Sequence, residues 1–385
     1  MGGNGARLDR MILLSGWLGR WESLGRPFLH LPRWAAVLAL GLLAATMALG
    51  AAAFAPQPEA PPAPAASPAT SAPGSPARAK GDMALYARIH ARMAAGEGYY
   101  TAAIAEQHAS NYPTRPVVAV RLPTLAWLQA AVGADGVRVL ALALVLACLW
   151  ALNAGSAPLA SVPERLGASA LLALGGGAAL SPVAGYDHDF IAGLLLTLAL
   201  LSYRPGRWWP ALLAAGAGLA VRELAAPFVL LWLAFALTDK RWREAAAATG
   251  LLVLLAIAMA LHFQAVEALR LPGDLASQGW SAQAGYGLPI TALGQLTGLR
   301  FLPASIAAPL AVLPLIGWAG LGGRFGLFAV LWFTGLATIM ALFARPENYY
   351  WAELALPAYA IGLAFAPRAL FELVRGAIAP TSRQT

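Results

Sequence analysis

Residues 208–238, WWPALLAAGAGLAVRELAAPFVLLWLAFALT, decide the fold class of this chain. The stretch carries no charge except Arg222 and Glu223 near its middle. A helix of about 20 apolar residues crosses the roughly 30 Å hydrocarbon core of a bilayer. The stretch predicts two short apolar membrane helices, 208–221 and 225–238, or a different division of the same residues around Arg222-Glu223. Charges in such a setting are costly unless they are paired or line a polar cavity. The Arg222-Glu223 pair is therefore either a functional site or an ion pair that stabilises helix packing.

The composition of the whole chain indicates the same class. Of its 385 residues, 59% are hydrophobic and 11% are charged, and the mean hydropathy is +0.64, which excludes an ordinary soluble domain. The net charge of +8 comes from short basic clusters between apolar blocks, so it does not predict a nucleic-acid partner. Cys148 is the single cysteine, which excludes a disulfide within the chain and a zinc site built from cysteines.

The apolar blocks predict an all-α, polytopic membrane bundle of about ten transmembrane helices. The predicted blocks are 35–55, 137–152, 166–182, 190–203, 208–221, 225–238, 244–262, 303–320, 325–343 and 352–366. Basic clusters mark the cytoplasmic side by the positive-inside rule and place both termini inside. These clusters are Arg7, Arg10, Arg20, Arg26 and Arg33, then Arg204/Arg207, Lys240/Arg241/Arg243, Arg324 and Arg368/Arg375.

Composition also divides the chain into segments. We predict a basic cytoplasmic segment at 1–34, an uncleaved anchor at 35–55, a Pro/Ala-rich linker at 56–80, a membrane domain at 81–366 and a cytoplasmic tail at 367–385. No internal repeat is evident by eye, which argues against a transporter built from inverted repeats.

Residues 81–100, GDMALYARIHARMAAGEGYY, predict an amphipathic juxtamembrane helix in the first outer loop. Asp82, Tyr86 and His90 recur at i, i+4 on one face, beside an apolar stripe. The stripe consists of Leu85, Ile89 and Met93. We expect this helix to lie on the membrane surface. In the alternative interpretation, Asp82 is merely solvated or caps an ordinary surface helix.

A proline-rich loop follows this helix. Its sequence, NYPTRPVVAVRLPTLAWLQ at 111–129, predicts a stiff connection that frames a site near the membrane. Tyr99 and Tyr100, just before it, suit the membrane interface. The alternative is a simple connection in which Arg115 and Arg121 contact lipid headgroups.

The acid at the start of this outer loop, the pattern Y-A-R-I-x-A-R-M-x-x-G-x-G-Y-Y and the following Y-P-T-R-P…L-P resemble the opening of GT-C membrane glycosyltransferases. That class includes glycosyltransferase family 39, the protein mannosyltransferases and the aminoarabinose transferase of lipid A. The resemblance implies a GT-C-like fold, a polyprenyl-phosphate-linked sugar donor and chemistry on the non-cytoplasmic face. It makes Asp82 the catalytic base, 81–366 the catalytic domain, and Tyr99, Tyr100 and Arg115 supporting residues. Many relatives have a second acid where this chain has Met83, so a role for that second acid does not carry over.

A second polar cluster, GYDHDF at 185–190, lies between two predicted spans. Asp187 and Asp189, with His188 between them, are candidates to hold an acceptor hydroxyl or a divalent metal, because hard cations prefer oxygen ligands. Tyr86 and His90 are further acceptor or metal candidates. The alternative is an ordinary loop in which the second Asp caps the next helix. No cofactor is implied beyond this metal.

Two arginines are candidates for the donor phosphate, because a guanidinium offers paired donors to phosphate oxygens. Arg222, with Glu223 in support, lies within the apolar stretch, and Arg345 follows the ninth predicted span. The alternative for Arg345 is anchoring at headgroups among neighbouring aromatic residues. His262 and the segment 263–302, which contains Gln278, Trp280 and Tyr286, are expected to cover the acceptor.

The sequence therefore predicts a membrane glycosyltransferase that moves a sugar from a polyprenyl-phosphate donor to a glycan, lipid or protein acceptor. The Arg-over-Lys composition indicates a bacterial inner membrane, with the active face toward the periplasm. One base, Asp82, favours a single inverting displacement. A transporter or flippase with the Arg222-Glu223 pair lining the path is the alternative, and a structural membrane protein is a third. In the enzyme, Asp82, Asp187 or Asp189, Arg222 and Arg345 should converge on one outward-facing cavity.

Overall fold

The computed structural model describes residues 19, 21–22, 24–53, 81–156 and 159–378. In these ranges all the regular elements are helices, and one isolated β-bridge pairs Arg115 with Ala276. The predicted linker at 56–80, most of the basic N-terminal segment and the last residues of the tail lie outside the described residues.

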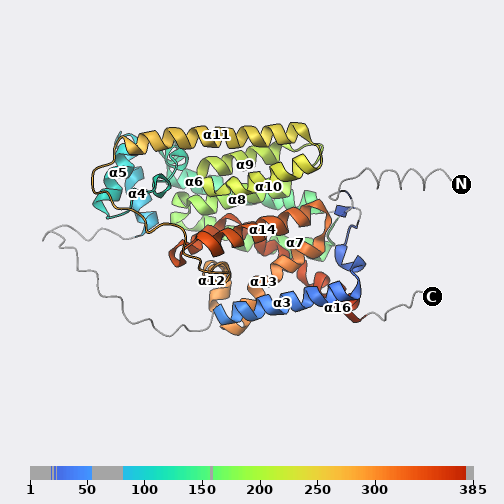
Figure 1. Cartoon of the computed structure of the whole chain (residues 1–385). Helices are drawn as coiled ribbons and strands as arrows, with labels where there is room; N and C mark the ends of the chain where they lie inside the picture. The colour runs from blue at the N-terminus through green and yellow to red at the C-terminus, as the bar shows by residue number, and fades with distance from the viewer. Residues whose placement is uncertain (1–18, 20, 23, 54–80, 157–158, 379–385) are drawn as a thin grey trace.

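Within these described ranges, four helices are long and apolar enough to cross a membrane. They are α3 (Arg33–Ala53), α6 (Thr124–Ser156), α11 (Trp242–Glu267) and α14 (Gly323–Phe343). Figure 1 shows α11, α14 and α3 running in roughly the same direction along the bundle. The chain is therefore an all-helical membrane protein, as the composition predicts.

The other apolar helices are shorter: α7 (Val162–Gly176), α8 (His188–Ser202), α9 (Trp209–Val221), α10 (Ala226–Thr238) and α13 (Ala304–Leu321). The 13 residues of α9 extend only about 20 Å at 1.5 Å per residue, less than the hydrocarbon thickness. Every predicted block except the last lies mainly on an α-helix, although the block 166–182 runs past Gly176, where α7 ends. The number of membrane crossings stays a prediction.

The last predicted block, 352–366, is not one helix. It is divided among the 3-10 helices η7 (Pro346–Leu354) and η8 (Ala360–Ala364), with the short α15 (Leu356–Tyr359) between them. Pro357 explains the break, because proline fits the first turn of a helix but not its interior. The amphipathic α16 (Ala366–Ile378) follows.

The predicted juxtamembrane helix is α4 (Asp82–Ala94), but its apolar stripe does not face lipid. Leu85 and Ile89 are buried in a small core with Ala102, Val120 and Val266. This core forms because α5 (Tyr99–Ala109) and the segment before α6 cover the stripe, so apolar area is removed from water within the protein. Figure 1 shows α4 and α5 at one end of the bundle.

The main core surrounds α8, which is buried along most of its length. Gly193 of α8 lies against η7, where a Cβ would overlap the Glu353 carbonyl oxygen. The close approach brings the start of α8 next to η7. The remaining elements are η1 (Pro27–His30), η2 (Val117–Ala119), η3 (Gly177–Leu180), η4 (Pro182–Tyr186), η5 (Glu223–Ala225), α12 (Gly287–Leu296) and η6 (Gly298–Phe301).

Candidate functional site

A polar cavity of about 600 Å³ lies at the end of the bundle where α4 packs. Five segments that are far apart in sequence line it: the start of α4, the loop from Asn111 to Arg121, the break between α9 and α10, the strap 275–280, and η7 with Arg345. The charged lining residues are Asp82, Glu223, Glu347, Arg121, Arg222 and Arg345. Five of the predicted site residues therefore line one cavity: Asp82, Tyr86, Arg222, Glu223 and Arg345.

Asp82 begins α4 and lines the cavity. Gly81 is the N-cap, with φ of 110°, a conformation that favours glycine. Asp82 is therefore not the cap, and its side chain accepts a hydrogen bond from Tyr112. Burial, together with the charge and hydrogen bond of Asp82, raises the pKa of Tyr112 to about 12. Tyr112 thus stays protonated at neutral pH and donates to the carboxylate.

Arg222 lies where the pair of apolar helices is interrupted. Its backbone is extended, with φ of −147° and ψ of 114°, so α9 ends at Val221. The Nε atom donates to Asp189 Oδ1 at 2.8 Å and Nη1 contacts Glu223. The Arg222 side chain is only 2% exposed. A charge buried this deeply requires such partners, so Arg222 is held by two carboxylates and also lines the cavity.

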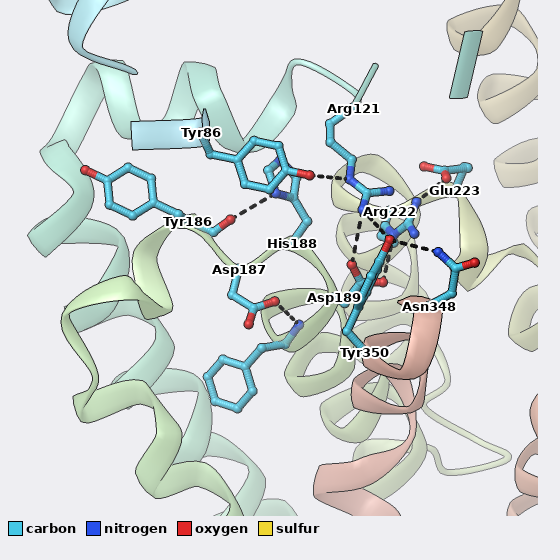
Figure 2. A network of polar contacts seen from close by, with 11 residues as sticks. Tyr86, Arg121, Tyr186, Asp187, His188, Asp189, Arg222, Glu223, Asn348 and Tyr350 are labelled. Atoms are coloured by element: carbon cyan, nitrogen blue, oxygen red, sulfur yellow. Dashed lines mark hydrogen bonds and ion pairs between the residues drawn. The ribbon is translucent and has the colours of Figure 1, made fainter. Parts of the chain in front are cut away.

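Arg121 completes this cluster, although the sequence offered it only a headgroup role. Its Nε donates to the Tyr86 hydroxyl at 2.9 Å, and its Nη2 lies 3.5 Å from the Tyr350 hydroxyl and 3.8 Å from Asp189 Oδ2. Figure 2 shows the guanidinium between these side chains, next to Arg222. Only long-range folding brings Tyr86 and Tyr350 to Arg121. Arg121 lies farther from Asp189 than Arg222 does, and its side chain is more exposed, so Arg121 is the more available of the two cations.

The GYDHDF cluster does not form the predicted metal pair. Asp189 is committed to the arginines, whereas Asp187 caps α8 by accepting from the Phe190 N–H at 2.9 Å. Asp187, and not Asp189 as in the alternative interpretation, therefore caps α8. His188 is buried, with Nδ1 3.0 Å from the Tyr186 carbonyl oxygen. Throughout the described part of the chain, no group of three His, Cys, Asp or Glu side chains is placed to hold a metal.

Several other predicted residues lie away from the cavity lining. His90 packs on the ring of Tyr186, with centroids 6.1 Å apart, and Arg115 is exposed on the loop. Tyr99 and Tyr100 lie behind the cavity, in the core beneath α4. Gln278 and Trp280 do line it, and Gln278 hydrogen-bonds Arg345. His262 is buried instead of covering an acceptor.

Glu353 of η7 is a half-buried carboxyl that sequence reasoning missed. It hydrogen-bonds Asp187, and both groups lie outside the apolar helices. Burial raises the pKa of Asp187 to about 6 and, with the charges of Asp187 and Asp189, raises the pKa of Glu353 to about 10. The pair therefore holds a proton at neutral pH. A single glutamate in the predicted block 352–366 gives no sequence signal of a contact with Asp187.

This carboxyl pair predicts pH-dependent stability. Folding raises the pKa of both carboxyls, so the pair stabilises the folded state at low pH. This contribution to the free energy of unfolding is complete below the unfolded-state pKa values near 4 and is lost as pH rises toward about 10. We expect Glu353→Gln to lose less thermal stability than the wild type between about pH 6 and about pH 9. Unfolding midpoints in detergent measure this, with exposed Glu347→Gln as control. Equal pH slopes for wild type and Glu353→Gln would contradict it.

No model of a known protein family, no curated protein and no solved structure matches the chain.

Proposed function

We propose that this protein is a membrane glycosyltransferase that takes a sugar from a polyprenyl-phosphate donor. The observation that supports it most is one cavity lined by a carboxylate, Asp82, and by three arginines that reach it from different segments. Glycosyl transfer from a lipid phosphate needs both: a base for the acceptor hydroxyl and positive charge for the leaving phosphate. The resemblance to GT-C enzymes rests on the residues around Asp82.

A neighbouring apolar cavity of about 380 Å³ supports a lipid-linked donor. It lies among α3, α12, α13 and α14, and its lining is almost entirely apolar. Trp351 lines the polar cavity, whereas the next residue, Ala352, lines the apolar one. Consecutive residues of η7 thus line both cavities, which supports a donor whose phosphate lies in the polar cavity and whose prenyl chain lies in the apolar one.

Each charged residue has its own role in the proposed reaction. Asp82 removes the proton from the acceptor hydroxyl, whose oxygen forms a bond to the anomeric carbon. The bond from that carbon to the phosphate oxygen breaks, and polyprenyl phosphate leaves with the electron pair. Arg121 and Arg345 neutralise the leaving phosphate, while Arg222 is held by Asp189 and Glu223 and fixes the wall behind them. One displacement at one base predicts inversion.

Charge placement supports an outward-facing site. The basic clusters at 204–207, 240–243 and 324 precede α9, α11 and α14, and these helices end near the cavity. The clusters therefore lie at the opposite end of the bundle, which the positive-inside rule assigns to the cytoplasm. We accordingly place the site on the periplasmic face of a bacterial inner membrane. A transport path would instead need polar residues along the bundle between its two ends.

The acceptor side of the cavity presents aromatic rings and amides. Tyr112, Trp280 and Tyr350 offer rings that pack on sugars, and Gln278 and Asn348 offer amide donors and acceptors. This lining suits a hydroxyl-rich acceptor, carried by a glycan, a lipid or a protein.

The test is sugar release by the purified protein in nanodiscs, supplied with radiolabelled polyprenyl-phosphate sugars and crude envelope acceptors. We expect the wild type to transfer sugar, and Arg121→Gln to lose at least about tenfold in kcat/KM because a charge-assisted phosphate contact is lost. Arg115→Gln, the same change at an exposed arginine of the same loop, should behave as wild type. In sealed proteoliposomes, movement of the lipid-linked sugar across the bilayer without transfer would instead establish a flippase.

A further inference from the structure

Arg121 carries its guanidinium into the cavity without support from regular secondary structure. It lies in the irregular residues between η2, which ends at Ala119, and α6, which begins at Thr124. Its side chain is nevertheless only 11% exposed and has three polar neighbours. Because no helix fixes the backbone at Arg121, other contacts must fix the direction of its Cα–Cβ bond.

Two buried side chains hold the main chain on either side of Arg121. The Tyr99 hydroxyl donates to the carbonyl oxygen of Arg121 at 2.5 Å, and Nε2 of His262 lies 3.1 Å from the carbonyl oxygen of Val120. Tyr99 is 6% exposed and His262 is 1% exposed. A carbonyl oxygen only accepts, so Nε2 carries the hydrogen in that bond. In the neutral ring Nδ1 is then the acceptor for the Tyr100 hydroxyl, 3.2 Å away.

These bonds reach the two peptide planes that flank one Cα atom. The Val120 carbonyl belongs to the plane before Arg121, and the Arg121 carbonyl to the plane after it. The relative orientation of two successive planes is the φ/ψ pair of the residue between them, and φ/ψ determines where its side chain points. Neither Tyr99 nor His262 lines the cavity, so each can act on a ligand only through Arg121.

We propose that Tyr99 and His262 are positioning residues for Arg121: they hold both flanking peptide planes, and so aim its guanidinium at an anionic phosphate in the cavity. Tyr100 orients the His262 ring for this task. The inference rests on the proposed function for the identity of the phosphate. The hydrogen bonds that define it are independent of that function.

The first experiment measures phosphate recognition without catalysis. Binding of farnesyl phosphate and of farnesol is compared, and we expect the wild type to prefer the phosphate. His262→Asn, whose shorter amide cannot reach Val120, should reduce this preference about tenfold, as expected for one buried hydrogen bond. His262→Gln places an amide N–H near the Nε2 position and should retain most of the preference.

A double-mutant cycle separates positioning from general destabilisation. In an Arg121→Gln background, His262→Asn should cause no further loss of phosphate preference, because its effect passes through Arg121. Equal losses in both backgrounds, or equal weakening of farnesyl phosphate and farnesol, would overturn the proposal.

Hydrogen exchange of the peptide 117–123 in the ligand-free protein gives a second, independent readout. His262→Asn and Tyr99→Phe should each accelerate exchange there, and His262→Gln should not. Unchanged exchange in the first two variants would overturn the positioning role. If the variants show the expected exchange but the wild type binds farnesyl phosphate and farnesol equally well, the positioning role is supported and the proposed function is overturned.

Discussion

Asp82→Asn is expected to lower sugar transfer by about 10²–10⁴-fold, the usual contribution of a general base. The amide keeps the size of the side chain and still accepts the hydrogen bond from Tyr112, so α4 and the cavity should remain intact. What is lost is the ability to take a proton from the acceptor hydroxyl. Initial rates with a saturating lipid-linked donor measure the change, at matched protein levels.

The matched control for this variant is Asp135→Asn. Asp135 is 89% exposed and does not line the cavity, so the Asp135→Asn protein should transfer sugar at the wild-type rate. Donor binding should be nearly unchanged in Asp82→Asn, because the arginines are untouched. If Asp82→Asn transfers sugar as fast as Asp135→Asn, then Asp82 is not the base.

Arg222→Leu should have the largest effect on stability. The substitution leaves Asp189 and Glu223 without the guanidinium that both contact. Removing one partner of a buried ion pair costs roughly 3–5 kcal/mol, because the remaining charge stays desolvated. Unfolding in detergent, followed by denaturant titration or heat, measures the loss. We expect Arg222→Leu to be poorly folded at temperatures at which the wild type is stable.

Two companion variants identify the cause. Adding Asp189→Asn to Arg222→Leu removes one uncompensated charge and should recover part of the lost stability. Arg115→Leu, the same change at an exposed arginine, should stay within about 0.5 kcal/mol of wild type. A loss for Arg222→Leu as small as that for Arg115→Leu would show that the cluster is solvated and not a buried ion network.

Local pattern was sufficient for the long apolar helices. The apolar runs around 35–55, 244–262 and 325–343 are about as long as a span requires, and α3, α11 and α14 occupy them. The i, i+4 spacing after Asp82 likewise predicted α4. Such features depend on residues within a few turns of each other, so they are visible in the sequence.

The sequence also contained the site in part. Arg222 and Arg345 were identifiable because each is a charge next to an apolar block, where charge has a high cost, whereas Asp82 was identified from the resemblance to GT-C enzymes. The interpretation of Asp187 and Asp189 as a pair was wrong in geometry. Neighbours in a D-x-D motif point in different directions at a helix start, and only the folded chain assigns one to the Phe190 N–H and the other to Arg222.

By itself, the sequence determined that this is an all-helical membrane chain with a charged break at Arg222-Glu223 and an acid at the start of α4. The tertiary structure alone decided that the stripe of α4 faces α5 instead of lipid. It also decided that Arg121 joins the cavity and that His262 holds Val120 from α11. The physical reason is that these outcomes depend on contacts between distant segments, whose partners are chosen by packing and by the pairing of buried polar groups.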